Sequence, residues 1–263
     1  MRNLIFNINL DDTKKWFKTN REKEVSLISK IGNVSINKIQ NRLVRKLQQR
    51  QFNHHAHPKN FDWAWEKKGF NRIAVVNYLI AKRGGLTSQY LEIGCAANTL
   101  FDSVASLNKI GVDPDAGGTH RMTSDEFFEK NREDFDVIFI DGLHEYTQVR
   151  KDALNSLKVL KEGGYIAFHD FLPSSWKEQH LPRISNNWTG DCWKLAVELA
   201  QAKGIEFKIL DIDHGVGLIK KTSSEWHISD FSYELKTAEF DKFVEVVGEL
   251  PLCSFEEAMK SLG

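Results

Sequence analysis

The chain has 263 residues, of which 41% are hydrophobic, and its 36 Lys and Arg residues balance 36 Asp and Glu residues. These values are typical of a globular protein, and the zero net charge argues against a chain that binds nucleic acid through overall basicity. There is no 18-residue apolar run or signal-peptide core, and the three cysteines are far apart. We therefore expect a cytoplasmic protein without a membrane span.

The first 50 residues are basic, with twelve Lys and Arg against four Asp and Glu. Apolar residues at helical spacing predict helices over Glu22–Ile31 and Ser35–Arg50, within a basic helical extension that covers residues 1–70. The favoured interpretation is an amphipathic surface that packs on the main domain or on a second copy, which would form a homo-oligomer. Contact with an anionic surface or with nucleic acid is the less favoured alternative.

The stretch from Gln89 to Asp113 is the most informative part of the chain. An apolar run over residues 90–93 leads into Gly94, a turn of small residues, a helical pattern and a second apolar run. This order predicts a strand–helix–strand unit whose turn directs backbone N–H groups toward a ligand. One face of the helical pattern is apolar: Leu100, Phe101, Val104 and Leu107. Asp113 ends the second strand and suits a ribose diol, so we predict a nucleotide-type ligand.

Beyond Asp113 the pattern predicts five more strands, near residues 121–123 and over residues 136–141, 165–170, 205–210 and 215–220. The last two form a hairpin, so the final strand should be antiparallel. We expect an α/β fold, namely a Rossmann-like, doubly wound, mostly parallel seven-stranded sheet with an antiparallel C-terminal hairpin. The domain should span residues 71–221 and be followed by a helical tail over residues 222–263.

The segments between these strands include two expected helices. One begins at Ser124 or Asp125, either of which can serve as its N-cap. The other spans His144–Lys161, and three of its positions are expected to be exposed and without a special role: Thr147, Gln148 and Arg150.

Polar residues follow three successive strands of the expected sheet: Asp113, Asp141 and the pair His169-Asp170. Ligands of open α/β sheets bind outside the carboxyl ends of the strands, so these groups and the nearby His144 should face one crevice. A carboxylate–imidazole group there can deprotonate a hydroxyl. The same set can hold a divalent cation, since carboxylates suit Mg²⁺ and imidazole shifts the preference toward Mn²⁺. Taken singly, each acid could instead be an ordinary turn or cap residue.

Six segments carry a resemblance to a known family: residues 91–95 (LEIGC), 110–114 (IGVDP), 139–146 (FIDGLHEY), 161–170, which begins KEGGY and ends in His169-Asp170, and the later 190–194 (GDCWK) and 213–217 (DHGVG). Together they resemble class I S-adenosylmethionine-dependent methyltransferases. More narrowly, they are similar to the bacterial group related to metal-dependent sugar and other small-molecule O-methyltransferases. The resemblance covers about residues 70–221.

The resemblance implies a role for each matching position. The methionine end of the cofactor would contact Glu92, Gly94 and Cys95. Asp113 would bind the ribose hydroxyls, and Asp141 would lie where the methyl donor and acceptor meet. Three further residues would surround the adenine: Met122, Ser124 and Asp125.

Two departures from the family pattern are visible. The metal-dependent relatives bind Mg²⁺ through an acid at the Asp141 position and two consecutive acids after the next strand, so the metal set here would be Asp141, His169 and Asp170, with histidine in place of one acid. In the first turn, Ala96 and Asn98 stand where glycines are usual. Asparagine tolerates a left-handed backbone better than most residues do, so the turn can still form.

The resulting expectation is an S-adenosylmethionine-dependent O-methyltransferase that acts on a small polar acceptor, namely a sugar or glycan precursor, with Mg²⁺ or Mn²⁺ as a further cofactor. His144 or His169 would be the base, with Asp141 as its partner. The alternatives are a dinucleotide oxidoreductase, which the missing G-x-G-x-x-G sequence disfavours, a non-catalytic cofactor-binding scaffold protein, and an RNA-methylating variant that uses the basic N-terminus.

Overall fold

The computed structural model describes residues 42–262, and the chain divides into two units, Met1–Gln51 and Phe52–Gly263. In the first unit, residues 42–51 form a helix, which confirms the C-terminal part of the helix expected over Ser35–Arg50. The helix expected over Glu22–Ile31 lies outside the described residues. Within the described part of the chain, no helix is long and apolar enough to cross a membrane.

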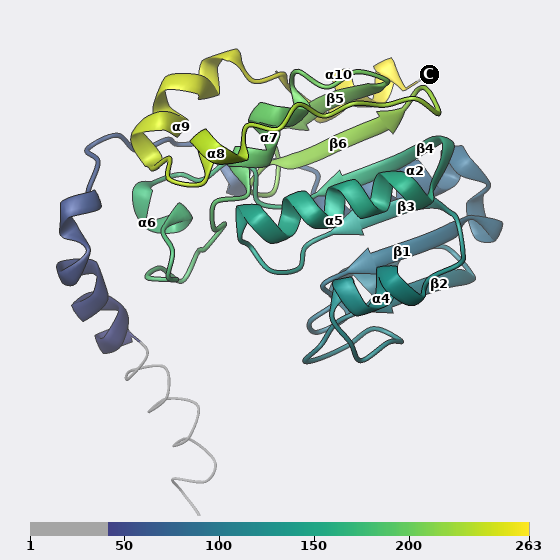
Figure 1. Cartoon of the computed structure of the whole chain (residues 1–263), viewed down its shortest axis with the longest axis horizontal. Helices are drawn as coiled ribbons and strands as arrows, with labels where there is room; N and C mark the ends of the chain where they lie inside the picture. The colour runs from purple at the N-terminus through teal and green to yellow at the C-terminus, as the bar shows by residue number, and fades with distance from the viewer. Residues whose placement is uncertain (1–41, 263) are drawn as a thin grey trace, which may run out of the picture. The chain divides into compact units, whose positions relative to one another are not determined.

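The second unit is built on a seven-stranded mixed sheet (Figure 1). In spatial order the strands are β2 (Asn108–Val112), β1 (Gln89–Ile93), β3 (Phe135–Ile140), β4 (Leu160–Phe168), β6 (Val216–Lys221), β5 (Ile205–Leu210) and β7 (Leu252–Cys253). The first four are mutually parallel, whereas β6 is antiparallel to both of its neighbours. The expected Rossmann-like, mostly parallel sheet with an antiparallel C-terminal hairpin is therefore confirmed.

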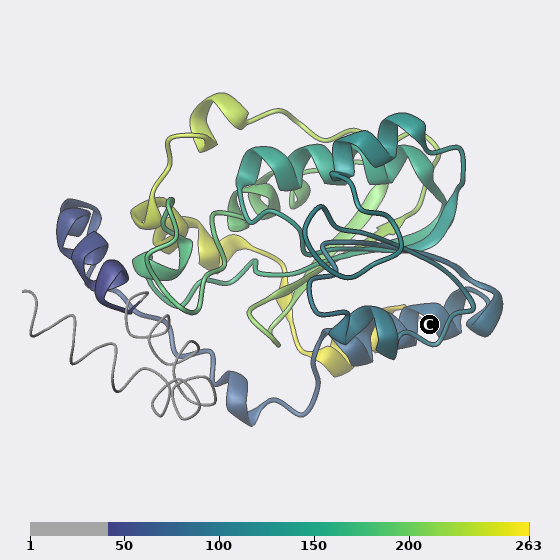
Figure 2. The ribbon, with the colours of Figure 1, turned by 90° about the horizontal axis from the view of Figure 1, so that it is seen from below.

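Helices cover both faces of this sheet. Their bounds are α2 (Arg72–Arg83), α3 (Thr99–Ser103), α4 (Ser124–Lys130), α5 (Tyr146–Val159), α6 (Trp176–Gln179), α7 (Trp193–Leu199), α8 (Ser232–Leu235), α9 (Phe240–Val246) and α10 (Phe255–Ser261). One core cluster joins the sheet to α4, α5, α7 and α9, and a second joins it to α2, α3 and α10. Figure 2 shows α5 on one side of the sheet and α2 and α10 on the other. Because helices cover both faces of the sheet, β3 is buried at every position.

The seventh strand is not the one that the sequence predicted. Near residues 121–123 the chain forms only an isolated bridge between Val112 and His120, because Thr123 is already the N-cap of α4 and closes a capping box with Glu126. This cap also corrects the expectation that Ser124 or Asp125 would be the N-cap. The seventh strand is β7, which comes from the C-terminal tail and runs parallel to β5.

The helix between β1 and β2 is shorter than expected. Helix α3 ends at Ser103, and Val104 continues in an extended conformation. The Asn77 side chain accepts a hydrogen bond from the Ala105 N–H at 2.8 Å, which secures the extended exit from the helix. As a result Leu107, predicted to face inward, is 79% exposed and does not belong to the core.

Candidate active site

The carboxyl ends of β1–β4 meet at one edge of the sheet, and the polar residues that follow them come together there. Strand β5 is aligned with β4 because both are antiparallel to β6. The turn between β5 and β6 therefore reaches the same edge and adds Asp213. The structure thus brings together three strand-end groups that the sequence singled out, Asp141, His169 and Asp170, and one that it did not.

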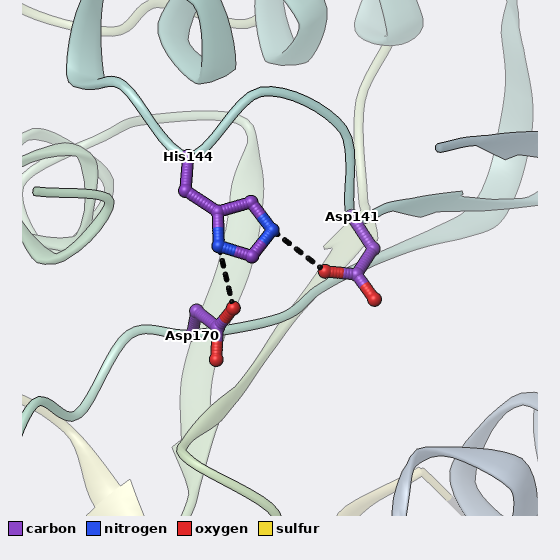
Figure 3. Close-up of side chains that lie close together, drawn as sticks. All are labelled: Asp141, His144 and Asp170. Carbon is purple, nitrogen blue, oxygen red and sulfur yellow. Dashed lines mark ion pairs between the residues drawn. The ribbon is translucent and has the colours of Figure 1, made fainter. Parts of the chain in front are cut away.

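The imidazole of His144 lies between two carboxylates (Figure 3). Its Nε2 is 3.3 Å from Asp141 Oδ1, and its Nδ1 is 2.9 Å from Asp170 Oδ2. Each of these three residues offers one ligand atom, and the three atoms lie within 4.8 Å of one another. Two carboxylates and an imidazole are a donor set that fits a divalent cation, with a preference for Mn²⁺ over Mg²⁺. In the described residues this cation cluster includes His144 rather than the predicted His169.

His169 is not one of the three cluster residues, but it contacts the same two carboxylates. Its Nδ1 is 3.3 Å from Asp141 Oδ1 and 3.2 Å from Asp170 Oδ1. On its other side, Arg72 Nη1 is 3.0 Å from Nε2 and also donates to both oxygens of Asp213. The ring is therefore fixed between carboxylates and a guanidinium.

Sequence reasoning assigned no role to Arg72 or Asp213. Asp213 lies in a segment that resembles the family and in a turn at the strand-end edge, whereas Arg72 is the first residue of α2 and carried no signal.

Charges within the cluster shift the pKa values of its members. Burial acts to lower the pKa of His144, but the carboxylates of Asp141 and Asp170 outweigh it and raise this pKa to about 10. For Asp141, burial acts to raise the pKa, and the two imidazoles more than offset it, so the carboxyl group stays ionised. At neutral pH, without a metal ion, His144 is therefore an imidazolium that bridges two carboxylates.

The backbone around the cluster is held in unusual conformations. Asp170, Asp213 and His214 have φ values of 67°, 44° and 62°, in the left-handed region that residues with side chains seldom adopt. Such conformations cost on the order of 1–3 kcal/mol each and concentrate at functional sites, where the surrounding structure holds them in place. Here they turn the chain sharply at the ends of β4 and β5, which directs the side chains into the crevice.

A long loop between β4 and α7 supplies one wall of the site. The Trp188 ring stacks on the His144 imidazole with centroids 5.2 Å apart and planes 11° from parallel. Gly190, with φ of 57°, passes so close that an added Cβ would lie 1.7 Å from the His144 carbonyl oxygen. Glycine at 190 is thus required for the loop to bring Trp188 onto the histidine.

The turn after β1 keeps the shape that glycines would give it. Ala96 and Asn98 adopt φ values of 44° and 61°, so both non-glycine residues take the left-handed conformation. Asp113 Oδ2 accepts hydrogen bonds from the N–H groups of Cys95 and Ala96 at 3.0 and 2.9 Å. Gly94 is indispensable in this packing, because an added Cβ would lie 2.2 Å from the Asp141 carbonyl oxygen.

Two adjoining cavities open beside the cluster. The first, of about 560 Å³, has the following predicted cofactor residues in its wall: Gly94, Asp113, Ser124, Asp125 and Asp141. The second, of about 480 Å³, is lined by the predicted residues Glu92, Gly94, Cys95, Asp141, His144, His169 and Asp170. Both cavities contact Gly94, Ala96, Asp141, His144 and Trp188, so they meet at the cluster. Met122, the remaining predicted residue, lines neither cavity and packs against the core.

Glu92 is a buried carboxyl group in the second cavity. It is 2% exposed and accepts a hydrogen bond from the Tyr90 hydroxyl at 2.6 Å. Burial raises the pKa of Glu92 to about 7. A cationic ligand group beside it would favour the ionised carboxylate.

Residues 96–171 match a family model described as a methyltransferase domain. These residues include Ala96 and Asn98 of the turn after β1, Asp113 and the whole Asp141–His144–Asp170 cluster. Over these residues the chain is similar to methyltransferases. The match bears out the resemblance noted from sequence at the level of a methyltransferase domain.

Other comparisons give partial matches. Over 50 residues, 19% of this chain, the sequence is 38% identical to the uncharacterized protein R132 of Acanthamoeba polyphaga mimivirus, and the match spans 23% of that protein. Among solved structures, the N-methyltransferase NodS from Bradyrhizobium japonicum WM9 is 18% identical, with 58% of this chain and 95% of NodS covered and a TM-score of 0.39.

Two further solved structures are similar at the same level. The MycE methyltransferase of the mycinamycin biosynthetic pathway, in complex with Mg, SAH and mycinamycin VI, is 15% identical, with 62% of this chain and 53% of MycE covered and a TM-score of 0.40. The SAH-bound methyltransferase PaMTH1 of Podospora anserina is 14% identical, with 68% of this chain and 96% of PaMTH1 covered and a TM-score of 0.42.

Proposed function

We propose that the protein transfers the methyl group of S-adenosylmethionine to a hydroxyl of a small polar acceptor of the sugar type. The observation that carries this proposal is the meeting of two cavities at Asp141 and His144. Methyl transfer needs donor and acceptor held in line at one point, and adjoining cavities supply such a point.

The cofactor would extend from the first cavity into the second. Its nucleoside would lie in the first cavity, against Asp113, Ser124 and Asp125. Its methionine part would pass Gly94 and reach Glu92, whose buried carboxyl group can accept hydrogen bonds from the ligand's ammonium group. Along this path the sulfonium methyl would lie near Asp141.

The rest of the second cavity would hold the acceptor. Its wall offers both donors and acceptors of hydrogen bonds, from Arg72, Asn186, Asn187, Asp213 and His214, together with the indole of Trp188. A polyol presents hydroxyls that donate and accept, so this mixed lining suits it better than an apolar acceptor.

The hydroxyl proton must leave as the methyl group arrives. His144 or His169 would accept it, with Asp141 and Asp170 orienting the imidazole and stabilising its charged form. As the alternative to a free base at His144, a divalent cation would be held by Asp141, His144 and Asp170, and it would lower the pKa of a hydroxyl bound to it.

Calorimetric titration with S-adenosylmethionine, with and without Mn²⁺ or Mg²⁺, tests the proposal. We expect micromolar binding of the cofactor and a separate heat for the metal ion that Asp170→Asn abolishes. Release of S-adenosylhomocysteine in the presence of sugars would then identify the acceptor. A protein that binds no S-adenosylmethionine under any of these conditions would overturn the proposed function.

A further inference from the structure

The helix over residues 42–51, drawn in purple in Figure 1, exposes its apolar face. Leu43, Val44 and Leu47 are 57%, 53% and 63% exposed. At 3.6 residues per turn, these side chains form one stripe about 100° wide, which amphipathic helices normally bury. The half-buried positions of the helix lie on its opposite, polar side: Arg45, Gln48 and Gln49. The described residues therefore leave the apolar stripe uncovered.

A row of basic side chains runs beside this stripe. Arg42, Lys46 and Arg50 recur at every fourth position, so they lie one above another along the flank next to Leu43 and Leu47. All three basic residues are exposed, and residues 42–51 contain no Asp or Glu. A partner that fits this face must accept aliphatic side chains and carry negative charge.

Charge and apolarity together decide among the possible occupants. A second copy packed through the same stripe would bring like charges together, since the helix carries only positive ones. Nucleic acid would neutralise the basic row through its phosphates but would leave the three aliphatic side chains in water. A bilayer with anionic lipids satisfies both requirements. The aliphatic side chains enter the boundary between headgroups and acyl chains, while Lys and Arg extend to the lipid phosphates.

We propose that residues 42–51 bind the surface of a membrane that contains anionic lipids, with the helix parallel to the bilayer plane and Leu43, Val44 and Leu47 inserted. The inference is independent of the proposed function, because it uses no residue of the candidate active site. Apolar insertion and electrostatic attraction act together in such helices. Each basic residue at an anionic surface raises the partition coefficient about fivefold, so the row of three contributes roughly 100-fold.

Co-sedimentation of the full chain with lipid vesicles tests the proposal. We expect binding to phosphatidylcholine vesicles that contain phosphatidylserine, no binding to phosphatidylcholine alone, and a loss of binding as the salt concentration rises. Combining Arg42→Gln, Lys46→Gln and Arg50→Gln preserves helix propensity and should lower the partition coefficient roughly 100-fold. Combining Leu43→Gln with Leu47→Gln keeps every charge and should lower it by about tenfold or more.

The matched control removes the same amount of charge from the second unit, at exposed lysines: Lys130→Gln, Lys158→Gln and Lys236→Gln. This variant should bind vesicles as the wild type does, because these lysines lie outside the helix. Reduced binding in the control equal to that of the basic-row variant would show that net charge, rather than the helix, attracts the vesicles.

Several results would overturn the proposal. Wild-type protein that does not bind the anionic vesicles refutes it, and equal binding to both kinds of vesicle refutes the role of the basic row. Unchanged binding in the leucine variant refutes insertion. Without vesicle binding, nucleic-acid binding that the leucine variant retains would identify nucleic acid as the partner, and self-association that this variant loses would identify a second copy. Binding of S-adenosylmethionine without vesicles bears on the proposed function alone.

Discussion

Asp113 was predicted to bind ribose, yet both of its oxygens are already engaged by the backbone. Oδ2 accepts from Cys95 and Ala96, and Oδ1 accepts from the N–H groups of Asp115 and Ala116 at 2.8 Å each. We predict that Asp113→Asn destabilises the protein even without cofactor. One amide oxygen can keep two of these bonds, while the amide NH₂ faces two N–H donors and loses the others.

The magnitude follows from the bonds lost. Hydrogen bonds to charged groups contribute about 1.5–3 kcal/mol each. Three of the four N–H donors belong to exposed residues that water can solvate, so the expected loss is about 3 kcal/mol in total rather than twice that. For a domain of this size, this corresponds to a fall in Tm of roughly 6–12 °C. Thermal unfolding followed by circular dichroism at pH 7 measures it, with Asp115→Asn as the exposed control.

Acid titration provides a second readout of the same reasoning. Burial acts to raise the pKa of Asp113, but the four backbone N–H groups outweigh it and lower the pKa. The stabilisation is therefore present above the ordinary carboxyl pKa and is lost as the pH falls through the lowered value. The Tm gap between wild type and Asp113→Asn should close only in that acidic range. An Asp113→Asn protein with wild-type Tm at pH 7 and weakened cofactor binding would show that Asp113 acts on the ligand alone.

Three further predictions concern the site. Gly94→Ala should abolish S-adenosylmethionine binding in calorimetry, because its Cβ would collide with the Asp141 carbonyl oxygen at 2.2 Å, whereas Gly69→Ala, with open space around it, should bind normally. His144→Ala and His169→Ala should each lower turnover by on the order of 10²-fold or more, and full activity in both would refute the assignment of the base. Mn²⁺ binding at pH 7 should release about one proton per ion, since the pKa of His144 is about 10, and titration in buffers of different ionisation enthalpy would detect it.

The sequence was sufficient for the parts of the fold and site that depend on strand ends. Buried parallel strands read as continuous apolar runs, so β1, β3 and the residues after them could be located to within a residue. Since parallel strands end at one edge, the convergence of Asp141 with His169 and Asp170 followed from topology alone. The left-handed conformation at Asn98 was likewise predictable, because asparagine tolerates it.

What the sequence could not supply depended on tertiary contacts. Arg72 begins a helix far from the strand ends in sequence, and only the packing of α2 brings it to Asp213. Gln148 has the spacing of an exposed helix position, but α4 lies against α5 and encloses it beside Ser124. Leu107 matched the inward face of a longer helix, and no local rule indicates that α3 ends at Ser103. For Gln148 and Leu107 the pattern was read correctly for an isolated element and was overridden by a neighbour.

The charge state of the cluster decides both whether His144 can act as a base and whether the cluster can bind a metal ion. With its pKa raised to about 10, His144 cannot accept a proton from a hydroxyl at neutral pH while it bridges Asp141 and Asp170. A second positive charge between those carboxylates would remove the reason for the raised pKa, because the imidazolium and the cation would repel each other. The features that make His144 a poor base in the metal-free protein are therefore the ones that make the cluster a cation site. On this argument, chelation should abolish the histidine-dependent part of turnover, and His144→Ala should cause little additional loss in chelator.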